Sequence, residues 1–191
     1  MRLILASQSK ARGALLTAAG YTFQTVFSNV DEPAPGDDAH LEHHVLELAI
    51  LKARAVAARH PNAVVIGADT ALILGHHIIG KPGSLAGAAR LLSALCGRTH
   101  RISSAACVIF PSTGSGKQRN MARLVDTAYV RLRQWTPERI RKHVAVTRPL
   151  AWAGAYAIQD PHSVAIVERI EGDPATVIGL PMKQLDRVLR G

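Results

Sequence analysis

The apolar positions in the first third of the chain alternate between short continuous runs and stripes with helical spacing. The run over residues 2–6 predicts a buried strand, and the pattern after it predicts a helix that begins near Ser9 and ends at Gly20. A second strand is expected over 21–27 and an amphipathic helix over 41–59. This alternation of strands and helices is typical of an α/β fold.

The remaining two thirds of the chain are richer in strands. The pattern predicts a strand over 64–74, a helix over 84–95, a long hairpin of strands over 99–110 and 121–132, a helix from Thr136 that ends before Pro149, a strand over 164–170 and a closing helix over 181–190. Because strands follow one another directly here, we expect a mixed sheet in an α/β or α+β domain. At 191 residues, without an internal repeat or a linker, the chain predicts a single domain over 1–191 or two closely packed lobes.

The strand over 64–74 carries one carboxylate, Asp69, near its centre. The run is apolar on both sides of the alternation, so the strand is expected to be buried on both faces, where an ionised side chain is costly without a partner. Gly67 removes a side chain just before it and lets another backbone or a ligand approach closely. The alternative interpretation is a turn over 67–70 that splits two strands.

Basic side chains recur on faces that the pattern predicts to be apolar. Arg12 shares a helical face with apolar residues close to the strand-to-helix junction at Ser7, where free backbone N–H groups and the helix dipole favour an anion. Lys52 occupies the apolar stripe of the second predicted helix. Both have a structural alternative, which is a solvated helix start capped by serine for Arg12 and a lysine that snorkels to the surface for Lys52. Lys81 and Glu32 are weak signals by themselves.

The composition limits the classes of molecule that the protein is expected to bind. A formal charge of +9 favours anionic partners such as nucleotides or nucleic acid. Aromatic residues make up only 4% of the chain and the basic residues are dispersed, which argues against a nucleic-acid-binding arm. No apolar run approaches the roughly 20 residues that span a bilayer. The two cysteines have no metal-ligand spacing, so we expect reduced core residues in a cytoplasmic protein.

Two apparent motifs do not support a function. The stretch over 112–117 superficially suggests a P-loop, but Pro111 stands at the first glycine position and Gln118 replaces the Mg²⁺-binding hydroxyl residue, so we interpret it as a hairpin loop. The nine histidines include adjacent pairs at 43–44 and 76–77. Members of such a pair point apart on a helix or strand, so they predict surface positions and not a metal site.

A set of short motifs occurs in a fixed order along the chain. They are Leu-Ala-Ser-Gln-Ser at 5–9 with Arg12, Asp31-Glu32, Lys52-Ala53, Gly67-Ala68-Asp69-Thr70, Gly80-Lys81-Pro82, Gly97-Arg98-Thr99-His100, Gly-Ala-Tyr-Ala-Ile-Gln at 154–159, Glu-Arg-Ile-Glu-Gly-Asp at 168–173 and Gly179-Leu180-Pro181. Each motif is weak alone. In this order they closely resemble the Maf family, the septum-formation-inhibitor-like nucleoside triphosphate pyrophosphatases, from Leu3 to nearly the last residue.

The resemblance implies an α/β fold in which a bent mixed β-sheet, flanked by helices, forms two lobes around a central cleft, as in inosine triphosphatase-like proteins. It implies hydrolysis of a nucleoside triphosphate to the monophosphate and pyrophosphate with a divalent metal, Mg²⁺ or Mn²⁺. Asp69 matches the residue that accepts a proton from the attacking water, and Glu32 would help Asp69 to hold the metal. The residues that match the phosphate-binding set are Ser7, Arg12, Lys52 and Lys81.

The residues that the resemblance connects with base specificity are Ala11, Thr70 and Gln159. Thr70 and Gln159 match the branch of the family that acts on dTTP and UTP, whereas the branch that acts on 7-methyl-GTP has an acid at the glutamine position. Ala11 departs from both branches, which have an arginine or a tryptophan there, and Asp160 replaces a usual glycine. The expected substrates are therefore dTTP, UTP or modified pyrimidine nucleotides, with 7-methyl-GTP as the alternative.

The expected partner is a nucleoside triphosphate, and neither a membrane nor nucleic acid is expected. Some relatives in the family form dimers, so a homodimer is the assembly that the resemblance suggests. The alternative outside catalysis is a basic nucleic-acid-binding regulator that has kept the scaffold, because the chain carries a large positive charge.

Overall fold

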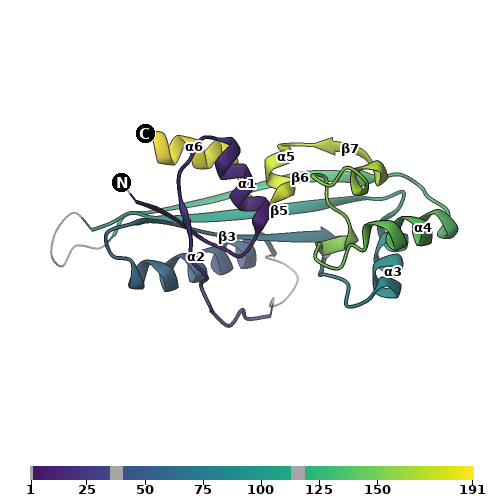
Figure 1. Ribbon diagram of the computed structural model, residues 1–191, viewed down its shortest axis with the longest axis horizontal. Coiled ribbons are helices and arrows are strands. Elements are labelled where there is room, and N and C mark those ends of the chain that lie inside the picture. Colours follow the sequence, from purple (N-terminus) through teal and green to yellow (C-terminus); the bar gives the residue numbers. More distant parts are fainter. Residues whose placement is uncertain (1, 35–40, 113–118) are drawn as a thin grey trace. The chain divides into compact units, whose positions relative to one another are not determined.

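The computed structural model describes residues 2–34, 41–112 and 119–191 (Figure 1). Its elements in chain order are β1 (Leu3–Ala6), α1 (Lys10–Ala18), β2 (Gln24–Thr25), α2 (Leu41–Arg59), β3 (Val64–Leu74), β4 (His77–Ile79), α3 (Leu85–Leu95), β5 (Thr99–Ile109), β6 (Met121–Leu132), α4 (Pro137–Thr147), the 3-10 helices η2 (Ala153–Ala155) and η3 (Ser163–Ile166), β7 (Val167–Glu171), α5 (Pro174–Ile178) and α6 (Met182–Arg190). Across these described residues, no helix is long and apolar enough to cross a membrane.

The strands of the described residues form one seven-stranded sheet. Its order is β2-β1-β3-β5-β6-β7, and β4 pairs with β3 outside this path. β1 runs parallel to both β2 and β3, whereas β4 is antiparallel to β3 and β7 is antiparallel to β6. The mixed sheet with helices that the sequence predicts is confirmed.

The chain divides into two compact units, each assembled from separate stretches of sequence. Unit 1 consists of Met1–Thr70, Ser104–Asp126 and Gly179–Gly191, and unit 2 consists of Ala71–Ser103 and Thr127–Ile178. Each unit has its own buried apolar core. The core of unit 1 includes Leu5, Leu16, Ile66, Val108 and Leu180, and the core of unit 2 includes Leu72, Leu92, Leu132, Ile140 and Ile166. The bend of the sheet and the central cleft that the resemblance implies stay predictions.

Three helices begin where the sequence predicts because a hydroxyl side chain caps each of them. Ser9, Ser84 and Thr136 each accept a hydrogen bond from the backbone N–H three residues further along, at the starts of α1, α3 and α4. Pro137 follows Thr136 at the first helical position, where its missing N–H has no cost. Each cap satisfies an N–H group that has no partner within its helix.

Two predicted strands are shorter than expected. The strand over 21–27 is reduced to β2, because β2 lies at the end of the sheet order and pairs only with Ile4 and Leu5 of the short β1. The strand over 164–170 begins with η3 and becomes extended only from Val167. The Asp160 carboxylate accepts a hydrogen bond from the Ser163 N–H, a contact that favours a turn at the start of η3.

Two short elements, β4 and α5, were not predicted; a turn at Gly75 and His76 precedes β4, and His77 is its first residue. The predicted hairpin strands 99–110 and 121–132 correspond to β5 and β6, which are neighbours in the sheet. The stretch over 112–117, interpreted above as their connecting loop, lies outside the described residues from 113 onward.

Candidate functional site

Two carboxylates meet at one buried lysine in unit 1. Lys52 Nζ lies 2.6 Å from Asp69 Oδ1 and 2.8 Å from Glu32 Oε1. Lys52 is only 8% exposed, whereas about half of the Glu32 side chain remains in contact with solvent. A lysine buried to this degree needs a charged partner. The geometry therefore favours the anion-binding interpretation of Lys52 over a lysine that snorkels to the surface.

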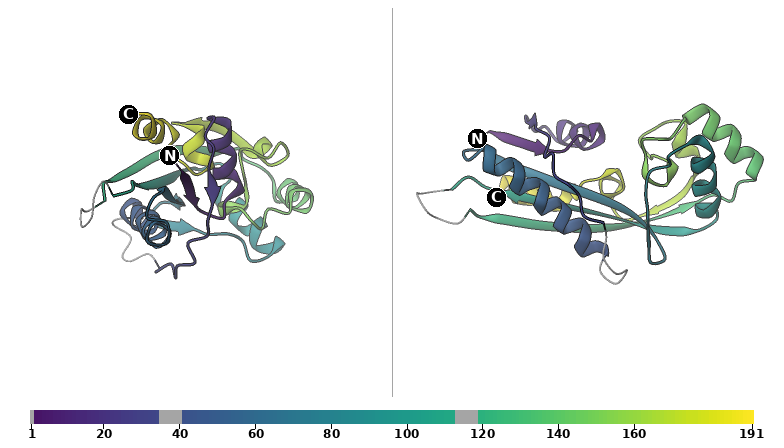
Figure 2. Two further views of the ribbon diagram at one scale, coloured as in Figure 1. Left: turned by 60° about the vertical axis from the view of Figure 1, so that its left-hand side comes forward. Right: turned by 90° about the horizontal axis from the view of Figure 1, so that it is seen from below.

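Gly67 explains why Lys52 reaches Asp69. β3 runs without a break through this position, so the turn interpretation does not hold. A Cβ atom added at Gly67 would collide with the backbone of α2 at Ala49 and Ala53, and Figure 2 shows α2 running along β3. Because Lys52 directly precedes Ala53 and Asp69 follows Gly67 by two residues, this close contact brings the lysine and the carboxylate together.

Arg12 is the centre of a second polar cluster in unit 1. Its Nε donates to Gly179 O at 2.9 Å, and its Nη2 donates to Thr70 Oγ1 at 2.9 Å. Its Nη1 donates to Ser7 Oγ and to Ala68 O, both at 3.0 Å. A guanidinium has five N–H donors, so these contacts leave one Nη2 N–H for a ligand. Arg12 points inward as predicted, and most of its donors hold the site together.

The electrostatics of the two clusters are linked. Burial lowers the pKa of the Arg12 guanidinium, and the negative charges of Asp69 and Glu32 raise it by a smaller amount. Arginine stays protonated in proteins because its ordinary pKa is so high. Arg12 and Lys52 therefore supply two positive charges against the two carboxylates, and their formal charges cancel. A polyphosphate bound here would bring excess negative charge and would need a further cation.

The pairing of β1 with β3 fixes the position of Ser7. The two strands are parallel with Ala6 opposite Gly67, so Ser7, which follows β1, lies beside the centre of β3. Ser7 Oγ also accepts a hydrogen bond from Ser9 N at 3.2 Å, and Ser9 Oγ accepts one from Arg12 N at 3.3 Å. One short turn therefore sets both the predicted phosphate-binding serine and the start of the helix that carries Arg12.

Thr70 is engaged within the Arg12 cluster. Besides accepting from Arg12, its Oγ1 lies 2.9 Å from Ser104 Oγ and 3.3 Å from Gly179 O. Sequence reasoning missed Ser104 and the Gly179 carbonyl as parts of the site. The available signals were two adjacent serines, Ser103 and Ser104, inside an otherwise apolar strand, and the motif that begins at Gly179.

Glu32 and Asp69 are the candidate metal ligands. Each uses one carboxylate oxygen toward Lys52. Within the parts of the chain that the structure describes, no three His, Cys, Asp or Glu side chains gather to hold a metal ion. Two carboxylates suit Mg²⁺ or Mn²⁺, which complete their coordination with water and substrate phosphates. They do not suit zinc, which usually takes three or four protein ligands.

Lys81 and Gln159 are exposed residues of unit 2. The Gly154 N–H donates to Gly80 O at 3.1 Å, which ties the segment that carries Lys81 to the segment that leads to Gln159. Gly154 has a φ of 68°, and a Cβ atom there would collide with the apolar core of unit 2. Two predicted site residues thus lie on hydrogen-bonded segments of one unit. Their convergence with Asp69 stays a prediction.

His100, from the motif Gly97-Arg98-Thr99-His100, is a buried residue of unit 2. Its Nε2 lies 2.6 Å from the Tyr156 hydroxyl, and the two rings meet edge to face. Burial lowers the pKa of His100 to about 4 and raises the pKa of Tyr156 well above its ordinary value. The pair is therefore neutral at pH 7 and connects β5 to the segment that leads to Gln159.

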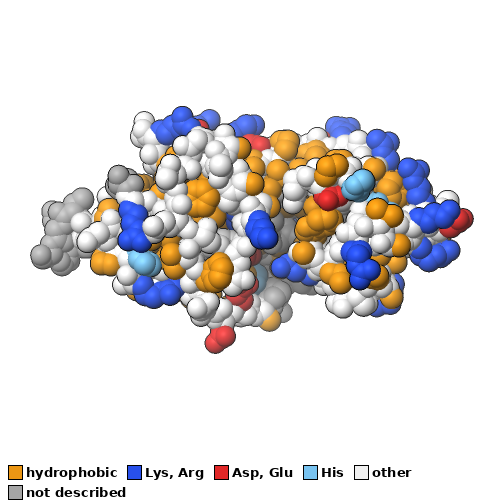
Figure 3. Space-filling model, in the orientation of Figure 1, with side chains coloured by type: hydrophobic (Ala, Val, Ile, Leu, Met, Phe, Trp, Pro, Cys, Tyr) orange, Lys and Arg blue, Asp and Glu red, His pale blue; other side chains and the backbone are white. Residues whose placement is uncertain are grey.

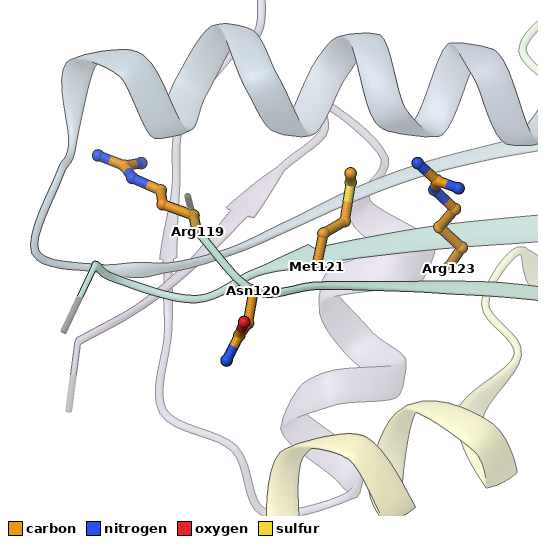
Figure 4. Close-up of a pocket in the computed structure, with 4 residues that line it drawn as sticks. All are labelled: Arg119, Asn120, Met121 and Arg123. Carbon is orange, nitrogen blue, oxygen red and sulfur yellow. The ribbon is translucent and has the colours of Figure 1, made fainter. Parts of the chain in front are cut away.

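A pocket elsewhere in unit 1 lacks the groups for this chemistry. It is lined by Arg119, Asn120, Met121 and Arg123, of which Asn120 points away from α2 while the others point toward it (Figure 4). Arg119 Nη1 donates to Ala57 O at 2.8 Å, so this side chain ties the start of β6 to α2. On the face shown in Figure 3, Lys and Arg side chains gather along the right-hand edge and form separate groups elsewhere.

Comparison with known proteins gives the family. The family model for the Maf-like protein matches residues 2–191. A dTTP/UTP pyrophosphatase of Moorella thermoacetica is 40% identical over 98% of this chain and 93% of its own length, and a 7-methyl-GTP pyrophosphatase of Mesorhizobium japonicum is 39% identical over 99% and 95%. Among solved structures, a HAM1 protein from Coxiella burnetii has a TM-score of 0.50 at 16% identity, covering 100% of this chain and 98% of that one, which shows a shared fold alone. This chain belongs to the Maf-like protein family.

Proposed function

We propose that this chain hydrolyses a nucleoside triphosphate to the monophosphate and pyrophosphate, with dTTP and UTP as substrates. The observation that carries the proposal is Lys52, held between Asp69 and Glu32 beside the Arg12 cluster. Such a site offers a base, two oxygen ligands for a hard cation and partly buried positive charge for phosphates. The relatives named dTTP/UTP pyrophosphatases support the pyrimidine substrates.

Asp69 is the proposed general base. Its carboxylate takes a proton from a water molecule as the water oxygen bonds to the α-phosphorus, and the bond from that phosphorus to the bridging oxygen breaks. Pyrophosphate leaves with the electron pair of the broken bond. Lys52, Lys81 and the remaining Arg12 N–H stabilise the negative charge that develops on it. Ser7 orients a phosphate from the start of α1.

Glu32 and Asp69 would hold the divalent cation, which polarises the water and offsets phosphate charge. We propose Mg²⁺ or Mn²⁺, since the donor set is two carboxylates. Lys52 keeps both carboxylates directed to one point. Activity should therefore be lost when a chelator removes the metal and return when Mg²⁺ or Mn²⁺ is added back.

The direct test is to incubate the purified protein with each metal and a panel of nucleoside triphosphates and to identify the products. We expect pyrophosphate and a nucleoside monophosphate from dTTP and UTP. Release of orthophosphate, or no turnover of any triphosphate, would contradict the proposal.

The Asp69→Asn variant tests the assignment of the base. Asparagine keeps an acceptor oxygen for Lys52 and a similar volume but cannot take the proton. We expect kcat to fall by about 10²–10⁴-fold or more, the usual contribution of a general base, while the unfolding curve stays close to that of the wild type. Near-normal turnover by a folded Asn variant would exclude Asp69 as the base.

A second candidate substrate is 7-methyl-GTP. It is favoured by the Mesorhizobium japonicum relative, whereas Ala11 departs from both branches and favours neither substrate. Ala11 is partly buried in the first turn of α1 and offers no side-chain hydrogen bond to a base. The ratio of kcat/KM for UTP to that for 7-methyl-GTP separates the two substrates. We assign base recognition to Ala11, Thr70 and Gln159.

We place this activity in the cytoplasm. Both cysteines are buried free thiols, and burial raises the pKa of Cys107 to about 11, which fits reduced core residues. The competing function, a nucleic-acid-binding regulator, predicts tight duplex binding with a steep salt dependence and no hydrolysis. A homodimer is a further proposal, which light scattering at several protein concentrations would test.

A further inference from the structure

Asp160 closes the loop that carries Gln159. Its Oδ1 accepts hydrogen bonds from the backbone N–H groups of His162, at 3.0 Å, and Ser163, at 2.6 Å. The Val164 N–H donates to Asp160 O at 2.9 Å. The residue after Gln159 thus binds three successive backbone N–H groups on the far side of the loop.

Ser163 ties the loop back to its beginning. Its hydroxyl is fully buried and accepts a hydrogen bond from the Ala157 N–H at 2.9 Å. The Asp160 N–H donates to Ala157 O at 3.4 Å. Gln159 is therefore an exposed side chain on a backbone that is fixed from both sides by groups of the loop itself.

We propose that Asp160 is a positioning residue that sets base selectivity by holding Gln159 in one place. This inference rests on the proposed function, because the contact of Gln159 with the base is part of that proposal. A residue without a side-chain acceptor, such as alanine or glycine, could not make the contacts of Asp160 to the His162 and Ser163 N–H groups. A loop that is ordered before binding loses less conformational entropy when the base binds. Its hydrogen-bonding side chain therefore discriminates more strongly between bases.

The charge of Asp160 has a separate effect, which the experiment must distinguish from the hydrogen bonds. Burial lowers the pKa of His143 in α4, and the negative charge of Asp160 raises it by less. Asp160→Asn keeps an acceptor oxygen and removes the charge, whereas Asp160→Ala removes both. Comparison of the two variants therefore isolates the loop contacts.

The experiment measures kcat and KM for UTP, CTP and 7-methyl-GTP in the wild type, Asp160→Ala and Asp160→Asn. In Asp160→Ala we expect KM for UTP to rise about tenfold with kcat within about threefold, and the UTP:CTP ratio of kcat/KM to fall by a similar factor, the loss usual for one hydrogen bond. Asp160→Asn should stay within about threefold of the wild type. Amide exchange at 157–163 should be faster in Asp160→Ala alone.

Thr136→Ala is the matched control, because it also removes a side-chain cap from a backbone N–H in unit 2. We expect it to lower stability without changing the selectivity ratio. Unchanged selectivity in Asp160→Ala, or equal changes in the Ala and Asn variants, would overturn the inference while wild-type hydrolysis stands. If the wild type releases no pyrophosphate, the proposed function itself fails.

Discussion

Lys52 is the residue on which the candidate site depends most. It lies between Asp69 and Glu32, and it is buried because helix α2 packs tightly on β3. Without it, two carboxylates would face each other with no counter-charge between them. Measuring both activity and stability after Lys52 is replaced therefore distinguishes a role in the site from a role in packing.

We predict that Lys52→Met, which keeps the apolar stem, lowers kcat/KM by at least about 10²-fold, the loss usual for an electrostatic stabiliser. The free energy of unfolding should fall by about 1–2 kcal/mol, less than for a fully buried pair because the Glu32 partner is half exposed. Pyrophosphate release and urea unfolding measure the two effects. Lys142→Met is the control, because it removes an exposed i,i+4 pair with Glu138, worth about 0.3–0.5 kcal/mol. Near-normal activity in Lys52→Met would return Lys52 to a packing role.

At the scale of residues, the sequence predicts which charged side chains point inward. It predicts less well which groups accept their hydrogen bonds. The inward direction of Arg12 and the burial of Lys52 both follow from helical periodicity. The acceptors of Arg12 do not, because two of them are the backbone carbonyls of Ala68 and Gly179, which leave no mark on a hydrophobic pattern. Most of the Arg12 donors therefore hold the site together, a role that neither the anion site nor the solvated helix start suggested by the sequence includes.

At the scale of elements, the contact of α2 with β3 is made possible by one missing side chain. The ideal Cβ of an alanine at position 67 would meet the backbone of Ala49 and Ala53, which cannot rotate away as a side chain can. The helix would have to move off the strand, and Lys52 would move with it. Stability and activity should therefore be lost together.

We predict that Gly67→Ala lowers the free energy of unfolding by about 3 kcal/mol or more, the upper end of the usual cost of overpacking, with a large loss of activity. Gly13→Ala is the matched control in the same unit. Gly13 lies inside α1, and its added Cβ would make only an ordinary contact with Phe23. That variant should be more stable by about 0.5–1 kcal/mol. A neutral Gly67→Ala, measured by urea unfolding, would contradict the packing argument.

Long periodic elements were predicted to within a residue or two, whereas β2, β4, α5 and the start of β7 were not. α2 and β3 have the bounds that their patterns predict, because each is long enough for packing to dominate. β2 is set by the few residues of β1 that it can pair with. β7 starts only after η3, whose first residue, Ser163, donates to the Asp160 carboxylate outside the strand. Local patterns do not report such contacts.

The buried pair of His100 and Tyr156, which joins β5 to the segment before Gln159, predicts that the stability of the fold depends on pH. The pKa of His100 is lowered from 6.5 to about 4 by burial, so between these values the unfolded chain binds a proton that the folded chain does not. The contribution of His100 to the free energy of unfolding is therefore fully present above about pH 6.5. It decreases as the pH falls toward 4, and the loss from this group approaches about 3 kcal/mol. His143, whose pKa is also lowered by burial, acts in the same direction.

Urea unfolding of the wild type and of His100→Gln between about pH 4.5 and 7 measures this effect. The variant keeps a polar partner for Tyr156 but has no group that titrates in this range. We expect the wild-type stability to fall more steeply with decreasing pH than that of the variant. Parallel slopes would show that His100 is not the source.

At the scale of the whole molecule, each unit is built from stretches that are far apart in sequence. Arg12 and Gly179 are 167 residues apart, yet they share a hydrogen bond within unit 1. Hydrophobic periodicity gives the elements but not which of them meet, so it could not place Ser104 or Gly179 in the site. The ordered motifs could indicate the family because they combine positions from both units.

The net charge of +9 belongs to the whole chain, and it predicts how the substrate arrives. A polyphosphate anion is attracted over distances comparable to the Debye length, which falls from about 10 Å at 0.1 M salt to about 3 Å at 1 M. Added KCl at constant Mg²⁺ should therefore raise KM and lower kcat/KM for UTP several-fold between about 0.02 and 0.5 M, while kcat changes little. Arg187→Glu, an exposed change on α6, lowers the formal charge from +9 to +7 and should weaken this salt dependence without altering kcat at saturation. If salt lowered kcat at constant KM instead, the charge would act on the chemical step at Asp69 and not on the approach of the nucleotide.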